Sequence, residues 1–280
     1  LYGPANEIYL KVGDKTIPLS GKWKYKISAS NSDFDFVEYG PNAYPSLLYN
    51  AMVNPLVGLS MRGVIWYQGE NNTNRAKEYY HLFPAMINDW RKKWGKDFPF
   101  YWVQLANYMD AVEVPSESLW AQVREAQTQT LSLSHTGQAV IIDIGEAKDI
   151  HPKNKQEVGR RLALHALHND YGFSDVVCES PMPKTVRRVQ DKIAVQFDNV
   201  ADGLIVKNKY GYLMSFAVAG NDGVYKWVQA KVAGKDRVVL SCPDVIDPVS
   251  VRYAWGDNPD DANLYNSVGL PATPFEIKIE

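Results

Sequence analysis

The stretch of sequence that decides the fold is Arg62-Gly63-Val64-Ile65-Trp66-Tyr67-Gln68-Gly69-Glu70-Asn71-Asn72. It begins as a short apolar run, and the run stops at a polar corner that contains a glycine. A short continuous apolar run bounded by turn residues is typical of a strand that is buried on both faces, as strands of parallel sheets are. We therefore expect residues 63–67 to form a buried strand and residues 68–72 to turn away from its carboxyl end.

On both sides of this strand, helical and strand patterns alternate. Apolar residues at helical spacing predict a helix opened by Pro45, a long helix whose stripe runs from Tyr79 to Trp94 before Gly95, and further helices over residues 118–130 and 154–169. Continuous apolar runs predict strands over residues 98–105 and 138–144. Buried strands separated by helices indicate an α/β fold with a parallel, doubly covered sheet.

The two ends of the chain show strand patterns instead. Residues 7–12 and 22–27 alternate apolar and polar positions, which predicts a small antiparallel piece. After residue 172, short strands are predicted over residues 193–197, 213–218, 224–228, 238–241 and 249–255. We divide the chain into residues 1–30, a small β segment expected to pack with the C-terminal domain; residues 31–175, the α/β domain; and residues 176–280, a β-rich, sandwich-like domain.

Composition excludes several classes of protein. The chain has 280 residues, is 45% hydrophobic and 22% charged, and has a formal net charge of −2, so a disordered or nucleic-acid-binding protein is not expected. No apolar stretch reaches the roughly 20 residues that span a bilayer. Leu1 is not a start methionine, and no signal-peptide pattern follows it, so we expect an upstream part to be missing. Cys178 and Cys242 could form one bridge or remain two buried thiols.

The polar corner is the first candidate site. In parallel sheets, ligands bind beyond the carboxyl ends of the strands, where loops and helix N-termini converge. Gly69 would let the backbone approach a reacting carbonyl, and the amide of Gln68 or Asn71 could donate a hydrogen bond to a developing oxyanion. The same residues also fit a simple loop and helix cap.

The second candidate site is Asp149-Ile150-His151-Pro152. Pro152 biases His151 away from helical backbone angles and favours a loop at a helix entrance. Asp149 would lie on the same side of an extended segment and could hold one ring nitrogen of His151 while the other faces a substrate. A surface histidine beside a capping aspartate fits the local pattern as well.

A nucleophilic serine is missing from the pattern. A nucleophile elbow runs from a strand into a helix. The Gly-x-Ser stretches that end at Ser60 and Ser174 each follow a predicted helix, so both serines are expected to be structural. Four other histidines show no convincing metal-ligand spacing, and we expect neither a metal nor another cofactor.

Four motifs in order resemble the sialate O-acetylesterases, which are SGNH-type hydrolases. The motifs cover residues 50–56, 62–70, 149–163 and 251–271, so the similarity runs over nearly the whole chain. The resemblance implies a flavodoxin-like, three-layer α/β/α esterase domain with an accessory β-rich domain. It also implies removal of O-acetyl groups from sialic acids by a Ser-His-Asp mechanism without a metal.

By the same resemblance, His151 would be the general base and Asp149 its orienting carboxylate. Gly69 and Asn71 would match the oxyanion block, with Gln68 and Glu70 close to the acetyl group. Arg124 falls in a further stretch similar to the family and would contact the sugar carboxylate, although an Arg-Glu pair on a helix is often only structural.

Two departures from the family pattern stand out. The Gly-Gln-Ser-Asn-type nucleophile segment is absent, so this chain alone would lack most acyl-transfer activity. The Asp-to-His spacing is one residue shorter than in SGNH enzymes generally, which leaves Asp143 and Glu146 as alternatives to Asp149.

The sequence therefore predicts a carbohydrate esterase whose serine comes from a missing N-terminal segment of the same protein. The expected ligand is an acetylated sialic acid or another acetylated sugar, and the expected location is periplasmic, secreted or lysosomal. Two other functions stay open: a non-catalytic carbohydrate-binding or scaffold protein that lost its nucleophile, and an acetyl esterase acting on xylan or another polysaccharide.

Overall fold

The computed structural model describes residues 8–24, 26, 40 and 44–280 of a chain that divides into two compact units, Leu1–Val57 and Gly58–Glu280. In the first unit, β1 (Tyr9–Val12) and β2 (Lys15–Pro18) form an antiparallel hairpin. The predicted antiparallel piece is thus confirmed, but its second strand was expected at residues 22–27 and lies at Lys15–Pro18. Gly13, with φ of 60°, closes a two-residue turn, so the residues directly after the turn pair with β1.

Around residue 50 the first unit is helical, as predicted from Pro45, but the helix is irregular. A π-helix, η4 (Tyr49–Val53), runs into a 3-10 turn, η5 (Asn54–Leu56). Pro55 lies within the 3-10 turn. Of the segment predicted as a strand over residues 22–27, Tyr25 and Ile27 lie outside the described residues. The expected packing of residues 1–30 with the C-terminal domain stays a prediction.

The second unit begins with a parallel sheet of three strands in the order β3-β4-β5. The strands alternate with helices along the chain, as the sequence predicts. The elements are β3 (Val64–Trp66), the 3-10 helix η6 (Glu70–Arg75), α1 (Ala76–Trp94), β4 (Phe100–Val103), α2 (Leu119–Gln129), the 3-10 turn η7 (Thr130–Ser132), β5 (Thr136–Ala139) and α3 (Lys155–Asp170).

The helix boundaries follow from local chemistry. Gly95 ends α1 in the left-handed conformation, with φ of 62°, and its N–H bonds the carbonyls of Arg91 and Lys92. The Oγ of Ser118 caps α2 by accepting from the N–H of Ala121, and Asn154 caps α3.

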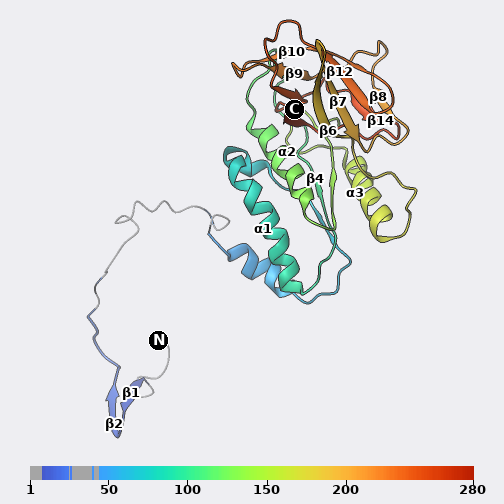
Figure 1. The fold of residues 1–280 in the computed structure, drawn as a ribbon. Helices are drawn as coiled ribbons and strands as arrows, with labels where there is room; N and C mark the ends of the chain where they lie inside the picture. Colours follow the sequence, from blue (N-terminus) through green and yellow to red (C-terminus); the bar gives the residue numbers. More distant parts are fainter. Residues whose placement is uncertain (1–7, 25, 27–39, 41–43) are drawn as a thin grey trace. The chain divides into compact units, whose positions relative to one another are not determined.

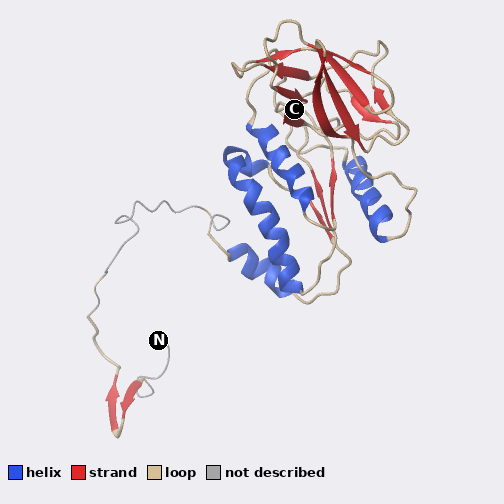
Figure 2. Cartoon of the chain, in the orientation of Figure 1, coloured by secondary structure: helices blue, strands red, loops and turns tan. Residues whose placement is uncertain are grey.

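The sheet lies between two helical layers (Figures 1 and 2). Helices α1 and α2 cover one face, where Phe83, Phe100 and Trp102 belong to one buried cluster. Helix α3 covers the other face, where Val158 and Leu162 pack with Val103. This is the expected three-layer α/β/α arrangement.

The rest of the second unit is a β sandwich. Two four-stranded antiparallel sheets, in the orders β10-β9-β13-β15 and β11-β12-β7-β6, contribute to one core. A two-stranded sheet pairs β14 with β8. The strands are β6 (Met182–Val189), β7 (Lys192–Asp198), β8 (Leu204–Val206), β9 (Phe216–Ala219), β10 (Tyr225–Trp227), β11 (Gln229–Val232), β12 (Arg237–Ser241), β13 (Ser250–Tyr253), β14 (Leu264–Asn266) and β15 (Phe275–Lys278).

The sandwich was predicted, but β6, β8, β11, β14 and β15 were not. Another difference concerns β5, which ends at Ala139 although the apolar run continues. Val140 and Ile142 belong to the sandwich core, whereas Ile141 packs under α3. The run stays apolar after β5 because its side chains are buried alternately in the core of the sandwich and in the core under α3.

Cys178 and Cys242 are two free, buried thiols. Among the described residues, no helix combines the length and the apolar character needed to cross a bilayer.

Candidate active site

The polar corner directly follows the carboxyl end of β3. Gly69 is buried there and has φ of 155°, a conformation that favours glycine. A Cβ at this position would lie 3.2 Å from both Leu105 Cδ2 and Gln127 Nε2. A side chain at this position would be strained by its backbone angle and would require Leu105 and Gln127 to shift by a few tenths of an ångström, so a glycine suits the turn into η6.

A hydrogen-bond network holds the corner in place. Gln68 Nε2 donates to Asn72 Oδ1 at 2.8 Å, and the hydroxyl of Tyr79 donates to Gln68 Oε1 at 3.1 Å. Gln127 Nε2 donates to the carbonyl of Gln68 at 3.3 Å, while its Oε1 accepts from the N–H of Leu105 at 3.0 Å. The amide of Gln68 is thus engaged within the protein.

The two neighbours in the corner are more accessible. Glu70 is half-buried and Asn71 is exposed, so the side chain of Asn71 is open to a ligand. Burial, together with the charge of Glu70, raises the pKa of Tyr67 far above its ordinary value. Tyr67 is therefore a neutral hydrogen-bond donor at physiological pH.

The loop between β5 and α3 carries His151. Its imidazole is 84% exposed, and Nδ1 lies 3.5 Å from Asp149 Oδ1. The same carboxylate oxygen accepts the backbone N–H of His151 at 2.9 Å, and this bond is the main cause that lowers the pKa of Asp149. Pro152 is buried and anchors the loop directly before α3. The ring of His151 is thus held from one side and open on the other.

The other two carboxylates near this loop are paired elsewhere. Asp143 makes a two-pronged ion pair with Arg161, at 2.6 and 2.9 Å. Glu146 accepts the ammonium of Lys153 at 2.8 Å. Of the three carboxylates considered from the sequence, Asp149 is the one placed beside His151.

The corner and the histidine loop lie at the same edge of the sheet. Because β3, β4 and β5 are parallel, the segments that follow them leave at one edge. The ammonium of Lys155, which begins α3, lies 5.0 Å from the ring centroid of Tyr67. Ile150 packs on the cluster that contains Tyr79, the residue bonded to Gln68.

Arg124 is placed differently from the expectation. It is fully buried, and its guanidinium donates to four carbonyls, those of Leu105, Ala106, Gly256 and Asp257. Burial lowers its pKa to about 9. The contact to a sugar carboxylate expected for Arg124 is not available in this arrangement, because the side chain has no exposed surface. Arg124 instead joins the α/β layers to the β sandwich.

Sequence reasoning missed Asn107, which follows β4 at the same edge. Its Oδ1 accepts the N–H of Gly145 at 2.7 Å, and its Nδ2 donates to Asn258 Oδ1 at 2.8 Å. A Cβ on Gly145 would collide with the backbone oxygen of Asn107. Asn107 is the first polar residue after the predicted strand 98–105, and that position was the signal that could have indicated it.

No serine in the described part of the chain is hydrogen-bonded to His151. The described residues also contain no group of three or more His, Cys, Asp or Glu side chains arranged to hold a metal ion. His165, for example, is buried with Nε2 3.0 Å from the carbonyl of Gln138, and burial lowers its pKa to about 4.

A parallel sheet between helical layers, with a histidine loop at its carboxyl edge and a β sandwich beside it, is the arrangement of the flavodoxin-like, three-layer SGNH hydrolases. Residues 32–168 match the family model described as carbohydrate esterase, sialic acid-specific acetylesterase. Over these residues the chain is similar to this family of carbohydrate esterases.

Solved and curated relatives agree with this similarity. The crystal structure of a carbohydrate acetylesterase from Xanthomonas citri matches with a TM-score of 0.79 and 44% identity, over 84% of this chain and 55% of that chain. Sialate O-acetylesterase of Rattus norvegicus is 31% identical over 87% of this chain and 50% of its own length. The human sialate O-acetylesterase is 31% identical over 84% of this chain and 49% of its own length. The chain spans about half the length of these curated relatives.

Proposed function

We propose that the chain is part of a carbohydrate O-acetylesterase that removes O-acetyl groups from sialic acids. Its contribution is the general base His151, the orienting carboxylate Asp149 and the oxyanion corner at Gly69 and Asn71. The observation that carries the proposal is the pairing of His151 with Asp149 in a loop at the sheet edge where the corner lies.

In this reaction a serine attacks the acetyl carbonyl and His151 takes the serine proton. The negative charge that develops on the carbonyl oxygen is stabilised by N–H donors of the corner, each typically worth about 3 kcal/mol. His151 then gives the proton to the sugar oxygen as that oxygen leaves. Water repeats the sequence on the acetyl-enzyme and releases acetate.

The serine is proposed to come from a segment upstream of residue 1, so that the chain alone is inactive. A feature of β3 supports an added segment. Within the described part of the chain, β3 pairs only with β4, and Ile65 in its centre is 71% exposed. A strand open along one edge and uncovered on one face can receive a further strand and helix.

Because the family resemblance links such enzymes to acetylated glycans outside the cytosol, we propose a periplasmic, secreted or lysosomal setting. A second candidate substrate, an acetylated neutral polysaccharide such as xylan, is favoured by one observation. An acid-lined cavity is connected to the histidine loop by hydrogen bonds through Met109.

The test measures acetate release from 9-O-acetyl-N-acetylneuraminic acid and from acetylated xylan. Two proteins are compared, the chain alone and the chain extended by its upstream Gly-x-Ser-Asn segment. The proposal expects hydrolysis only by the extended protein, with loss of activity in the variant His151→Ala. An extended protein without esterase activity would favour the binding-module alternative, and an active chain alone would show that the serine lies within it.

A further inference from the structure

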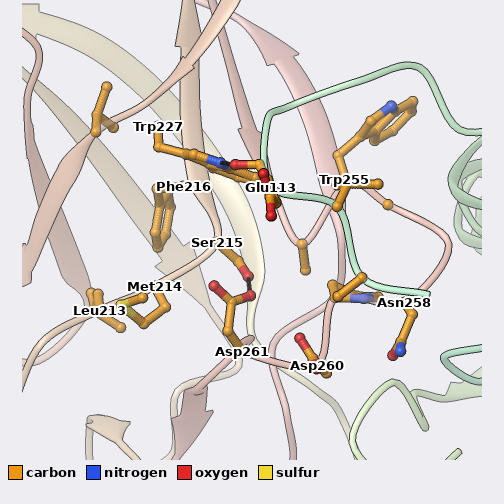
Figure 3. A pocket seen from close by; sticks show the side chains of 16 residues that line it. Glu113, Leu213, Met214, Ser215, Phe216, Trp227, Trp255, Asn258, Asp260 and Asp261 are labelled. Atoms are coloured by element: carbon orange, nitrogen blue, oxygen red, sulfur yellow. Dashed lines mark hydrogen bonds between the residues drawn. The ribbon is translucent and has the colours of Figure 1, made fainter. Parts of the chain in front are cut away.

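A cavity of about 330 Å³ lies where the β sandwich meets the loop after β4, and it takes no part in the proposed acyl transfer (Figure 3). Its volume is at the lower end of the range for small-ligand sites. One wall comes from residues 111–113 and the others from residues 213–216, 227–228, 254–256 and 258–261. It is therefore a site built jointly by the two halves of the second unit.

One side of the cavity is aromatic. Phe216 is buried, whereas Trp227 is 43% exposed. The indole Nε1 of Trp227 donates to the backbone carbonyl of Glu113 at 2.9 Å, so the ring plane is fixed from the opposite wall. A fixed and partly exposed aromatic face offers a flat apolar surface at little cost in side-chain entropy.

The other side is acidic. Asp260 and Asp261 are exposed, and the hydroxyl of Ser215 donates to Asp261. Figure 3 shows both carboxylates below the indole of Trp227, with Glu113 between them. Among the described residues that line the cavity there is no Lys, Arg or His. The cavity thus offers negatively charged hydrogen-bond acceptors. Its described lining has no positively charged side chain that could pair with an anionic ligand.

This combination selects an uncharged sugar. A pyranose ring has a C–H face that packs on an aromatic ring and hydroxyls that donate to carboxylates, with which they form short, charge-assisted hydrogen bonds. A sialic acid carries a carboxylate of its own, which three neighbouring carboxylates would repel. The chemistry of the wall therefore disfavours a sugar acid and favours a neutral unit.

The cavity is coupled to the histidine loop through Met109. Asn258, a wall residue, donates through Nδ2 to the carbonyl of Met109 at 2.8 Å. The N–H of Met109 donates to the carbonyl of Ala147 at 3.0 Å. Ala147 belongs to the same loop as Asp149 and His151, so two hydrogen bonds through Met109 connect a wall of the cavity to the candidate catalytic loop.

We infer that this cavity is a subsite for a neutral sugar unit of the acetylated glycan, adjacent to the unit that carries the acetyl group. The inference rests on the proposed function for the nature of the glycan. Its test measures binding without an ester, so a failed acetylesterase assay would leave it untouched.

The experiment titrates the chain with xylotetraose, a neutral tetrasaccharide, and separately with N-acetylneuraminic acid, followed by calorimetry. Xylotetraose is expected to bind, and N-acetylneuraminic acid to bind more weakly. Trp227→Ala should weaken xylotetraose binding about tenfold, since it removes the aromatic platform. The control Trp23→Ala removes a tryptophan that is 69% exposed and lies outside the cavity, and it should leave the affinity unchanged.

Two further variants separate binding from folding. Trp227→Phe keeps an aromatic ring and should retain most of the affinity, and thermal unfolding shows whether each variant is folded. Asp260→Lys should weaken xylotetraose binding and strengthen binding of N-acetylneuraminic acid, whereas Asp202→Asn, at an exposed position outside the cavity, should change neither. The inference is overturned if xylotetraose does not bind, if Trp227→Ala and Trp23→Ala bind it equally, or if Trp227→Ala weakens binding of N-acetylneuraminic acid as much as it weakens binding of xylotetraose.

Discussion

Asp149 contacts His151 twice, through the imidazole Nδ1 at 3.5 Å and through the backbone N–H at 2.9 Å, both at the same carboxylate oxygen. The carboxylate therefore fixes the loop and the ring together. The depressed pKa of Asp149 keeps it ionised well into the acidic range, so it can stabilise an imidazolium throughout the pH range in which an esterase works.

The first prediction concerns the choice of carboxylate. In the complete esterase, Asp149→Asn should lower kcat by about 100-fold or more, since the ring loses its orienting charge. Glu146→Gln should have a small effect, because Glu146 is bound to Lys153. Steady-state hydrolysis of an acetyl ester measures both variants. A larger loss in Glu146→Gln than in Asp149→Asn would contradict the assignment.

The second prediction concerns the corner. Gly69→Ala combines a backbone conformation that disfavours side chains with close contacts to Leu105 and Gln127, so we expect a loss of about 1–3 kcal/mol in the free energy of unfolding. Gly159→Ala is the matched control. A Cβ there meets nothing within 4 Å, and the helix interior should gain about 0.5–1 kcal/mol. Urea unfolding measures both, and equal effects would argue against a strained corner.

The third prediction concerns Arg124. Arg124→Met leaves four carbonyls without their donor, and losing a partner typically costs about 1–3 kcal/mol for a buried group, so we expect a loss of several kcal/mol. The control Arg75→Gln breaks an exposed pair with Glu78 and should change stability by less than about 0.5 kcal/mol. Denaturant midpoints compare the two. A small effect at Arg124, with sugar affinity lost instead, would restore its expected role as a ligand residue.

The fourth prediction is a pH dependence at the start of α3. Hydrogen bonds from Arg160 and Arg161 lower the pKa of Glu157 to about 2. A carboxylate with a depressed folded pKa stabilises the fold fully above its unfolded value, about 4.3, and that stabilisation is lost as the pH falls toward 2. Glu157→Gln should therefore destabilise the chain at neutral pH, and the difference from the native chain should shrink below about pH 4. A difference that stays constant with pH, in urea unfolding at several pH values, would show that the ion pairs are not its cause.

The fifth prediction concerns the open edge of β3. Ile65→Lys should change the stability of the chain by no more than about 0.5 kcal/mol, because Ile65 is 71% exposed. It should strongly weaken recovery of esterase activity when the upstream segment is supplied as a separate polypeptide. The control is Leu82→Lys, at an apolar position on α1 that is 50% exposed. This variant should recover esterase activity as well as the native chain does. Identical recovery in both variants would place the docking surface elsewhere.

The sequence by itself determined the elements whose physics is local. The period of apolar residues determined α1, the glycine at position 95 determined its end, and the short apolar run before residue 68 determined the strand β3. The burial expected for that strand was wrong, because Ile65 in its centre is 71% exposed and β3 has a paired neighbour on one side only among the described residues. The motif around His151 likewise predicted a loop at a helix entrance, since Pro152 and Asn154 act on their immediate neighbours.

The tertiary structure decided what depends on partners far away in the chain. Arg124 is a residue type that often binds anionic ligands. Its guanidinium is instead buried and donates to the carbonyls of Gly256 and Asp257, which lie more than a hundred positions later in the chain. The run after Ala139 reads as one strand, yet its side chains divide between two cores. The cavity beneath Trp227 combines loops from both halves, so no local pattern could indicate it. Local propensities act over a few residues, whereas burial and charge pairing are set only when distant segments pack together.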